Sequence, residues 1–250
     1  MITGEERRKR WMQAAVLVAM VSLALPVAAK EKKDDKEEAA SPVVLRVNGE
    51  EVTKAELDEM TRGNERFYDL TNQSVRERLH GKTLTEYLFR EEILKIKAVS
   101  QINKEALPAM KATVDAALAK IQGGADFADV AKDVSQDEST APNGGLMLGQ
   151  EFFKLVPPFN RVALSAKQGE VKGPILTMFG YHLLKVEKIY PPMEGKPKRV
   201  DVRHILVKFP NAGPDFRQKV EEAADASKIE MVDKSYCKKM PSYCEAGTGL

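Results

Sequence analysis

Cysteine, histidine and tryptophan are scarce in this sequence, and neither sign of charge dominates. The 250 residues include only two cysteines, three histidines and one tryptophan. The 39 basic residues are nearly balanced by 37 acidic ones, so the chain lacks the Lys/Arg excess of a nucleic-acid-binding protein. Apolar residues make up 43% and charged residues 30%, an ordinary globular balance in a chain long enough for one or two domains.

Both cysteines, Cys237 and Cys244, lie close to the end of the sequence. No histidine or third cysteine is near them, whereas a structural metal site takes about four ligands. Six residues separate them, rather than the two of a Cys-x-x-Cys redox motif. Two neighbouring thiols in an oxidising compartment usually pair. The sequence therefore favours a disulfide that closes a small loop over a metal site or a redox motif.

Residues 1–29 have the three-part layout of a secretory signal peptide. Four consecutive cations end at Arg10, an apolar run extends from Trp11 to Ala28, and small residues fit cleavage after Ala29. The alternative is an uncleaved anchor, because 18 residues is near the lower limit for spanning a bilayer. Both alternatives predict a periplasmic or other extracytoplasmic location for the rest of the chain.

Local motifs predict a hairpin followed by helices in residues 43–104. Asn48-Gly49 stands between short β-prone runs, which is a strong hairpin signal because both positions tolerate positive φ. Capping boxes begin at Thr53 and Thr83, each with a glutamate three residues later that satisfies backbone N–H groups at a helix start.

Residues 105–209 mix helical and alternating patterns. Apolar spacing predicts a helix from about Glu105 to Gln122, and Asp126 is the expected cap of a short helix after it. Alternating apolar residues predict strands at 181–190 and 199–209.

Five motifs follow one another in an informative order between residues 124 and 184. They are Gly124–Asp137, Asn143-Gly-Gly, Val156-Pro-Pro-Phe159, Gly169-Glu-Val-Lys-Gly-Pro174 and Phe179-Gly-Tyr-His-Leu-Leu184. In this order they resemble the parvulin (PpiC-type, rotamase) family of peptidyl-prolyl cis-trans isomerases, and His204-Ile-Leu-Val-Lys208 resembles that family's first strand. Residues 43–122 are more loosely similar to the helical chaperone segment of SurA-type and PpiC-type exported isomerases.

The resemblance implies an α+β fold with a four-stranded antiparallel sheet, as in parvulin and FKBP-like domains. In the family, the strand with the His-Ile-Leu-Val motif is the first strand of the domain. In this chain the only copy of that motif comes after the final strand of the predicted domain. Either the domain is circularly permuted, with its usual first strand at 199–209, or this strand begins a second, truncated parvulin domain. Permutation is favoured, because the domain would otherwise lack its central strand. A hairpin centred on Met193 would set His182 and His204 directly opposite each other on one face of the sheet.

With this resemblance, the chain is expected to have five parts. They are a signal peptide (1–29), a charged linker (30–42), a helical chaperone-like segment (43–104), a parvulin-like isomerase domain (105–209), and a C-terminal part (210–250) with a charged helix from Asp215 to about Val232 and the cysteine loop.

The resemblance also implies a polar group of site residues. His182 and His204 match the family's paired histidines, whose mutual hydrogen bonding organises the site. Thr177 matches a hydroxyl that can fix a histidine tautomer. Asp137 occupies the family's Cys-or-Asp position beside the prolyl amide. The alternative is structural: a satisfied strand histidine, or an aspartate that caps a turn.

The same comparison implies an apolar pocket for the proline ring. Leu155 and Phe159 are expected to form it, with Met147 as a further wall and Phe179 near its rim; each could instead be an ordinary core residue. One loop departs from the family, which usually continues Asp-Leu-Gly-Trp-Phe where this chain has Leu146-Met-Leu-Gly-Gln150.

The function that the resemblance implies is cis/trans isomerisation of X-Pro bonds in unfolded or nascent exported proteins. The barrier to rotation about a peptide bond is about 18–20 kcal/mol. A catalyst that favours the twisted amide needs no nucleophile, metal or cofactor. The altered loop and the displaced strand motivate an alternative, a non-catalytic holdase with a degenerate parvulin domain.

Overall fold

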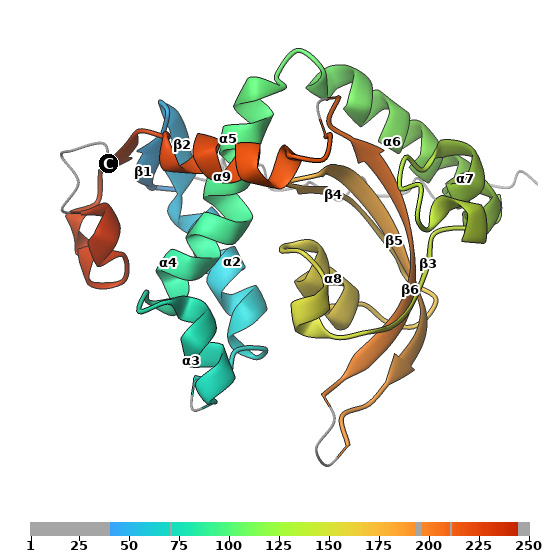
Figure 1. The fold of residues 1–250 in the computed structure, drawn as a ribbon, viewed down its shortest axis with the longest axis horizontal. Coiled ribbons are helices and arrows are strands. Elements are labelled where there is room, and N and C mark those ends of the chain that lie inside the picture. The colour runs from blue at the N-terminus through green and yellow to red at the C-terminus, as the bar shows by residue number, and fades with distance from the viewer. Residues whose placement is uncertain (1–40, 71, 194–196, 211, 245–250) are drawn as a thin grey trace, which may run out of the picture. The chain divides into compact units, whose positions relative to one another are not determined.

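The structure is a computed structural model that describes residues 41–250, except 71, 194–196, 211 and 245–250 (Figure 1). The predicted signal peptide and residues 30–40 of the predicted linker lie outside the described residues. Within the described part, no helix combines the length and the apolar character needed to cross a membrane.

The described chain contains two sheets and several helices. Its first half consists of β1 (Val43–Val47), β2 (Glu50–Thr53), α2 (Lys54–Glu65), α3 (Gln73–Leu79), α4 (Leu84–Phe89), the π-helical turn η1 (Arg90–Leu94), α5 (Lys95–Ile102), α6 (Leu107–Gln122) and α7 (Phe127–Val134). Its second half consists of η2 (Ala141–Asn143), β3 (Leu146–Gln150), η3 (Phe152–Lys154), α8 (Phe159–Ser165), β4 (Val171–Thr177), β5 (Gly180–Tyr190), β6 (Arg199–Lys208), α9 (Phe216–Asp225), β7 (Ile229–Met231), η4 (Lys234–Lys238) and η5 (Pro241–Tyr243).

The predicted hairpin and capping boxes are confirmed. Asn48 and Gly49 form the turn between β1 and β2, with φ of 52° and 87°. Thr53 caps α2 and Thr83 caps α4, each in a reciprocal hydrogen-bond pair with the glutamate three residues later.

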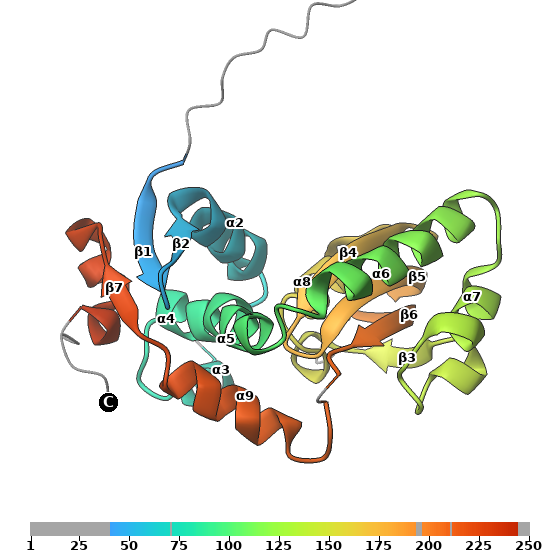
Figure 2. The same cartoon turned by 90° about the horizontal axis from the view of Figure 1, so that it is seen from above.

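The C-terminal helix is shorter than the sequence predicts. Instead of continuing to about Val232, α9 ends at Asp225, and β7 follows as a third strand beside β1 (Figure 2). The side chain of Asn48 accepts a hydrogen bond from the backbone N–H of Lys228 and donates one to the hydroxyl of Ser227. Strand pairing with the free edge of β1 therefore outweighs helix propensity in this segment.

The main sheet has four antiparallel strands in the order β3-β6-β5-β4. The predicted α+β class and four-stranded antiparallel sheet are thus confirmed. The strand that carries the His-Ile-Leu-Val motif, β6, lies between β5 and β3.

The expected register of β5 and β6 is wrong by two residues. His182 lies opposite Leu206, and His204 lies opposite Leu184. The midpoint of the turn between β5 and β6 lies beyond Met193, since Tyr190 pairs with Arg199. A bulge between Val186 and Lys188 then moves the pairing back by one residue. Because the net displacement is even, the two histidines still share one face, as diagonal rather than directly opposed neighbours.

The two faces of the main sheet are covered by different helices. Leu183 and Ile205 pack in one core with residues of α6 and α7, while Leu184 and Val202 pack in another with α8 (Figure 1). His182 lies two residues from Leu184, and His204 lies two residues from Val202. Since side chains alternate between the two faces of a strand, both histidines face α8. The core on the α8 side also includes residues of β1 and the cysteine loop. The domain boundaries expected from the sequence stay a prediction.

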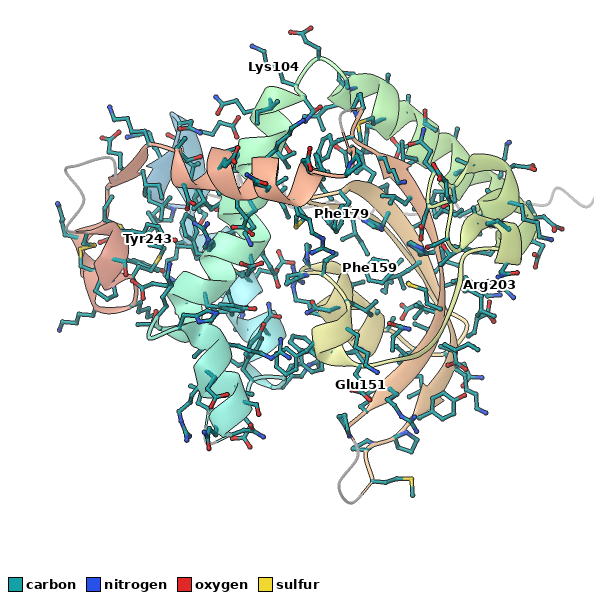
Figure 3. All side chains as sticks on the ribbon, viewed as in Figure 1. Lys104, Glu151, Phe159, Phe179, Arg203 and Tyr243 are labelled. Carbon is teal, nitrogen blue, oxygen red and sulfur yellow. A yellow bond between two sulfur atoms is a disulfide. The ribbon has the colours of Figure 1, made fainter. Side chains whose placement is uncertain are left out.

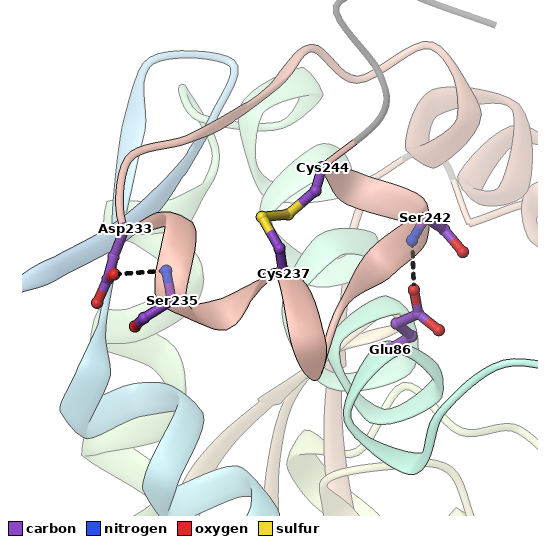
Figure 4. The surroundings of a disulfide bond; sticks show 6 residues. All are labelled: Glu86, Asp233, Ser235, Cys237, Ser242 and Cys244. Atoms are coloured by element: carbon purple, nitrogen blue, oxygen red, sulfur yellow. Dashed lines mark hydrogen bonds between the residues drawn. A yellow bond between two sulfur atoms is a disulfide. The ribbon is translucent and has the colours of Figure 1, made fainter.

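The cysteine loop packs against α4 (Figure 4). Cys237 and Cys244 form a disulfide with Cα atoms 5.5 Å apart. Glu86, the capping glutamate of α4, accepts a hydrogen bond of 2.7 Å from the backbone N–H of Ser242. Met240, between the cysteines, is completely buried. The loop is thereby held by a covalent bond, a buried carboxylate and an apolar anchor.

Candidate active site

A pocket of about 350 Å³ lies on the α8 face of the main sheet. Seven of the eight residues that the resemblance places in the site line it, and the eighth, Thr177, lies behind one of its histidines (Figure 3, where Phe159 and Phe179 are labelled). The seven are Asp137, Met147, Leu155, Phe159, Phe179, His182 and His204. Segments separated by up to 67 residues thus converge on one cavity.

Phe159 lies in the first turn of α8 against both imidazoles. Its ring centroid is 5.2 Å from that of His182 and 5.9 Å from that of His204, in edge-on arrangements. Only 2% of Phe159 is exposed. Edge-on contacts of this kind fix the orientation of aromatic rings, so Phe159 and the two histidines form one rigid group of rings in the pocket.

Thr177 holds His182 from behind the pocket. Its hydroxyl accepts a hydrogen bond from the backbone N–H of Phe179 (3.1 Å) and lies 2.8 Å from Nε2 of His182. Burial, together with the neighbouring His204, lowers the pKa of His182 to about 3. His182 is therefore a neutral imidazole at neutral pH, as the tautomer-fixing role proposed for Thr177 requires.

The burial of neutral His182 predicts a pH-dependent stability. Between the pKa of about 3 in the folded protein and about 6.5 in the unfolded chain, only the unfolded chain binds the extra proton. The free energy of unfolding is therefore expected to fall as the pH is lowered through this window, by up to about 1.4 kcal/mol per pH unit from this group. Denaturant titrations at pH 7, 6, 5 and 4 measure the slope.

A His182→Gln variant is expected to show a smaller slope between pH 6.5 and 4. His80→Asn, which removes an exposed histidine in a left-handed conformation that asparagine tolerates, is the control. If His182→Gln and the parent protein lose stability in parallel over this range, the neutral buried imidazole is contradicted.

Asp137 binds His204 from the loop after α7. One carboxylate oxygen accepts hydrogen bonds from Nε2 of His204 (2.8 Å) and the hydroxyl of Thr140 (2.6 Å). The other accepts from the hydroxyl (2.7 Å) and backbone N–H (3.2 Å) of Ser139. The hydrogen bond from His204, with those from Thr140 and Ser139, holds the pKa of Asp137 well below its usual range. Since an ionised carboxylate only accepts, the proton of a neutral His204 is on Nε2.

The expected hydrogen bond between the two histidines is absent. Their rings instead stack, with centroids 5.8 Å apart and planes inclined by 19°. Both Nδ1 atoms are buried without a hydrogen bond to any described residue. The displaced register explains the difference, because diagonal neighbours on a sheet lie farther apart than directly opposed ones.

The loop that departs from the family still forms one edge of the sheet. Asp201 of β6 accepts hydrogen bonds from the backbone N–H of Gly149 (2.7 Å) and from the hydroxyl of Tyr190 (2.8 Å). The pairing of β3 with β6 shifts between Met147 and Gln150. Met147 consequently lines the pocket although the usual aromatic pair of this loop is missing.

A buried ionic cluster connects α8 to the helices before it. Glu92, in the π-helical turn η1, accepts hydrogen bonds from Asn64 of α2 (2.7 Å) and from Nε of Arg161 of α8 (3.2 Å). Gly63 leaves room for this approach, since a Cβ atom there would lie 2.8 Å from Cδ of Arg161. Burial raises the pKa of Glu92 in spite of the guanidinium. The cluster holds the helix that supplies Phe159.

Several residues of the site were not predicted from the sequence. Ser139 and Thr140 follow Asp137 at spacings typical of turns closed by an aspartate, and this signal could have identified them. Lys154, Lys208 and Arg217 also line the pocket. Arg217 belongs to α9, and no motif connects that helix with the site.

Comparison with known families finds a parvulin-type domain in this chain. Residues 93–188 match the Rotamase family, described as the PPIC-type PPIASE domain. The chain therefore carries a PpiC-type parvulin domain. The matched residues include His182 but end before β6, which supplies His204.

The relatives of this chain are foldases. It is 34% identical over 114 residues to "Foldase protein PrsA" of Clostridium botulinum (strain 657 / Type Ba4), a match that covers 44% of this chain and 34% of the relative. It is 29% identical over 192 residues to the protein of the same name from Caldanaerobacter subterraneus subsp. tengcongensis, a match that covers 72% of this chain and 62% of the relative. This chain thus matches about a third of the length of the Clostridium relative. These relatives are PrsA foldases and do not specifically support the SurA resemblance of the N-terminal segment.

A solved structure is also similar, the foldase protein PrsA from Streptococcus pneumoniae, at 17% identity. The match covers 77% of this chain and 82% of that one, with a TM-score of 0.21. The TM-score is too low for individual elements of the two structures to be compared.

Proposed function

We propose that this protein is an extracytoplasmic peptidyl-prolyl cis-trans isomerase that assists the folding of exported proteins. The observation that supports this most is the pocket in which Phe159 contacts both His182 and His204. Its apolar lining has the size and character to hold a proline ring. The name of the relatives, foldase, agrees with this activity.

Catalysis in such a pocket depends on the shape and polarity of the site. Phe159, Leu155 and Met147 would hold the proline ring and exclude water, so that the preceding amide is free to twist. Neutral His182 and the Asp137–His204 pair would keep the polar wall rigid. Because one oxygen of Asp137 accepts a hydrogen bond from His204 while Thr140 and Ser139 hold the carboxylate in place, its role would be to orient His204.

We further infer that the parvulin domain is circularly permuted. The position of β6 between β3 and β5 supports this, because β6 carries the His-Ile-Leu-Val motif of the family's first strand. The described residues from 93 to 145 contain no strand that could take this place. The sheet is complete with β6, so a second parvulin domain is not needed to explain the motif.

A holdase is the second candidate function. A groove of about 590 Å³ lies between α5 and α9, outside the isomerase pocket. Phe216 and Val220 line it, and Ile102 at its edge is 61% exposed. Such a surface could bind apolar segments of unfolded chains. An Ile102→Glu variant that loses suppression of client aggregation but keeps isomerase activity would support it.

The isomerase is tested by replacing Phe159 with leucine. The smaller side chain should loosen the grip on the proline ring and lower kcat/KM for a short Ala-Pro peptide by about tenfold or more, since tenfold corresponds to only about 1.4 kcal/mol of transition-state stabilisation. A protease-coupled isomerisation assay measures it, with thermal denaturation to establish that the variant is folded.

Phe152→Leu is the matched control for Phe159→Leu. Phe152 is also buried, at 7% exposed, but it stacks on Phe67 and does not line the pocket. It should lower stability without a comparable loss of kcat/KM. A wild-type protein that leaves the uncatalysed rate of isomerisation unchanged would rule out the enzyme and leave the holdase.

A further inference from the structure

Residues 229–244, the C-terminal clasp, join the edge of β1 to the helical segment. At one end of the clasp, the three residues of β7 pair with β1. The backbone N–H groups of Val232 and Asp233 then both donate to the carbonyl of Val44, at 2.9 Å each. The other end consists of η4 and η5, which the disulfide links to each other (Figure 4). The clasp thus bridges a strand and a helix that lie far from it in the sequence.

The clasp is attached to the helical segment by a few contacts that the disulfide encloses. Met240 is completely buried, in the same core cluster as Phe89 of α4. The backbone N–H of Ser242 donates to the carboxylate of Glu86 (2.7 Å), which is itself buried. Met240 and Ser242 both lie between the two cysteines, which are seven residues apart in the sequence. The crosslink therefore restricts the very residues that hold the clasp in place.

The disulfide is accessible and is flanked by cations. Cys237 and Cys244 are both only partly buried. Lys238 follows Cys237 directly, Lys234 and Lys239 lie within three residues of it, and all three lysines are exposed. Residues 234–244 contain no acid. Cations near a disulfide attract an attacking thiolate and stabilise the thiolate that leaves, whereas buried cysteines in apolar surroundings are inert. These surroundings favour thiol–disulfide exchange.

We propose that the Cys237–Cys244 disulfide is a site of thiol–disulfide exchange, and that its reduction by a dithiol releases the clasp from α4 and from the edge of β1. One thiolate of the dithiol attacks a cysteine sulfur, the S–S bond breaks and a mixed disulfide forms. The second thiolate of the dithiol displaces that cysteine, and the dithiol leaves as a disulfide. Two electrons and two protons thereby pass from the dithiol to Cys237 and Cys244. This inference is independent of the proposed isomerase function.

The release is expected to be local. Without the crosslink, the loop must order Met240 and Ser242 at the full cost of its conformational entropy, and β7 is too short to compensate. The clasp belongs to the sheet β2-β1-β7, whereas the histidines of the candidate active site lie in the four-stranded sheet. Opening of the clasp therefore uncovers the edge of β1 and leaves the four-stranded sheet intact.

Hydrogen exchange of the full chain at pH 7, with and without dithiothreitol, tests the release. Reduction is expected to accelerate exchange of the amides of Asp233 and Ser242 by at least about tenfold, because closing a loop of this length suppresses open states by a comparable factor. The amide of His204, which donates to the carbonyl of Gly145 (2.9 Å), should keep its rate. Unchanged exchange at Asp233 and Ser242 in the reduced protein, or equal acceleration at His204, would overturn the local release.

The double variant Cys237→Ser/Cys244→Ser should show the fast exchange without dithiothreitol and no response to it. The exchange reaction itself is followed by alkylation of the native protein with iodoacetamide after graded exposure to dithiothreitol. Lys238→Gln is expected to slow reduction about threefold at low ionic strength, and Lys132→Gln, which removes an exposed cation of α7, should not. An equal rate in these two variants would overturn the part assigned to the lysines. Thiols that are alkylated only in denaturant would overturn the exchange site.

Discussion

Replacing Gly145 with alanine is expected to destabilise the protein by more than about 3 kcal/mol and to abolish the proposed isomerase activity. Gly145 has φ of +74°, and a Cβ atom added there would lie 2.0 Å from the backbone oxygen of His204. The neighbour is the backbone of the central strand β6, so no side chain can rotate away. The carbonyl of Gly145 also accepts a hydrogen bond of 2.9 Å from the N–H of His204. Urea denaturation measures the loss of stability.

Gly169→Ala is the matched control for this substitution. Gly169 has nearly the same backbone conformation, with φ of +80°, but an added Cβ atom would meet nothing within 4 Å. The left-handed conformation alone costs about 1–2 kcal/mol. The difference between the two variants therefore isolates the clash with β6. Equal losses would show that the loop can move away from His204, and the close packing would then not be required.

Most of the fold could be predicted because its signals are local. The positive φ at Asn48 and Gly49 and the reciprocal caps at Thr53 and Thr83 depend on a few neighbouring residues. Parvulin motifs in sequence order placed seven residues around one pocket for the same reason. Each motif forms its own turn, helix or strand, and the sheet then brings these elements together.

The features that could not be predicted depend on contacts between distant segments. β7 exists because the free edge of β1 accepts it, and residues 229–231 alone give no sign of that partner. Arg217 reaches the site because Glu221 is drawn to Arg90 and Lys95. The register of the histidines was misjudged because the turn between β5 and β6 is centred beyond Met193 and a bulge near Glu187 moves the pairing back by one residue, and sequence alternation reveals neither.

The contact between the helical segment and α8, which carries Phe159, is expected to be essential for stability. Glu92→Ala should lower the free energy of unfolding by about 3–5 kcal/mol, because it leaves the guanidinium of Arg161 without its buried partner. The side chain of Glu92 is 2% exposed, and it also accepts a hydrogen bond from completely buried Asn64. Denaturant unfolding of the full chain is the measurement.

Glu59→Ala provides the control, because Glu59 contacts the same guanidinium from the solvent side. Its carboxylate lies 3.6 Å from Nη1 of Arg161, but its side chain is 74% exposed. Exposed pairs of this kind contribute at most about 1 kcal/mol. A loss for Glu92→Ala no larger than that for Glu59→Ala would mean that α8 is held by its apolar face alone.

The same pair of variants tests whether the helical segment supports catalysis. Arg161 follows Phe159 by two residues on α8, so a shift of this helix moves the ring away from both imidazoles. Glu92→Ala, assayed at a temperature where it remains folded, should therefore lower kcat/KM about tenfold, since small displacements of positioning groups have large effects on rate. Glu59→Ala should keep the parent kcat/KM. Full activity of folded Glu92→Ala would separate the helical segment from the isomerase reaction and restrict its role to stability.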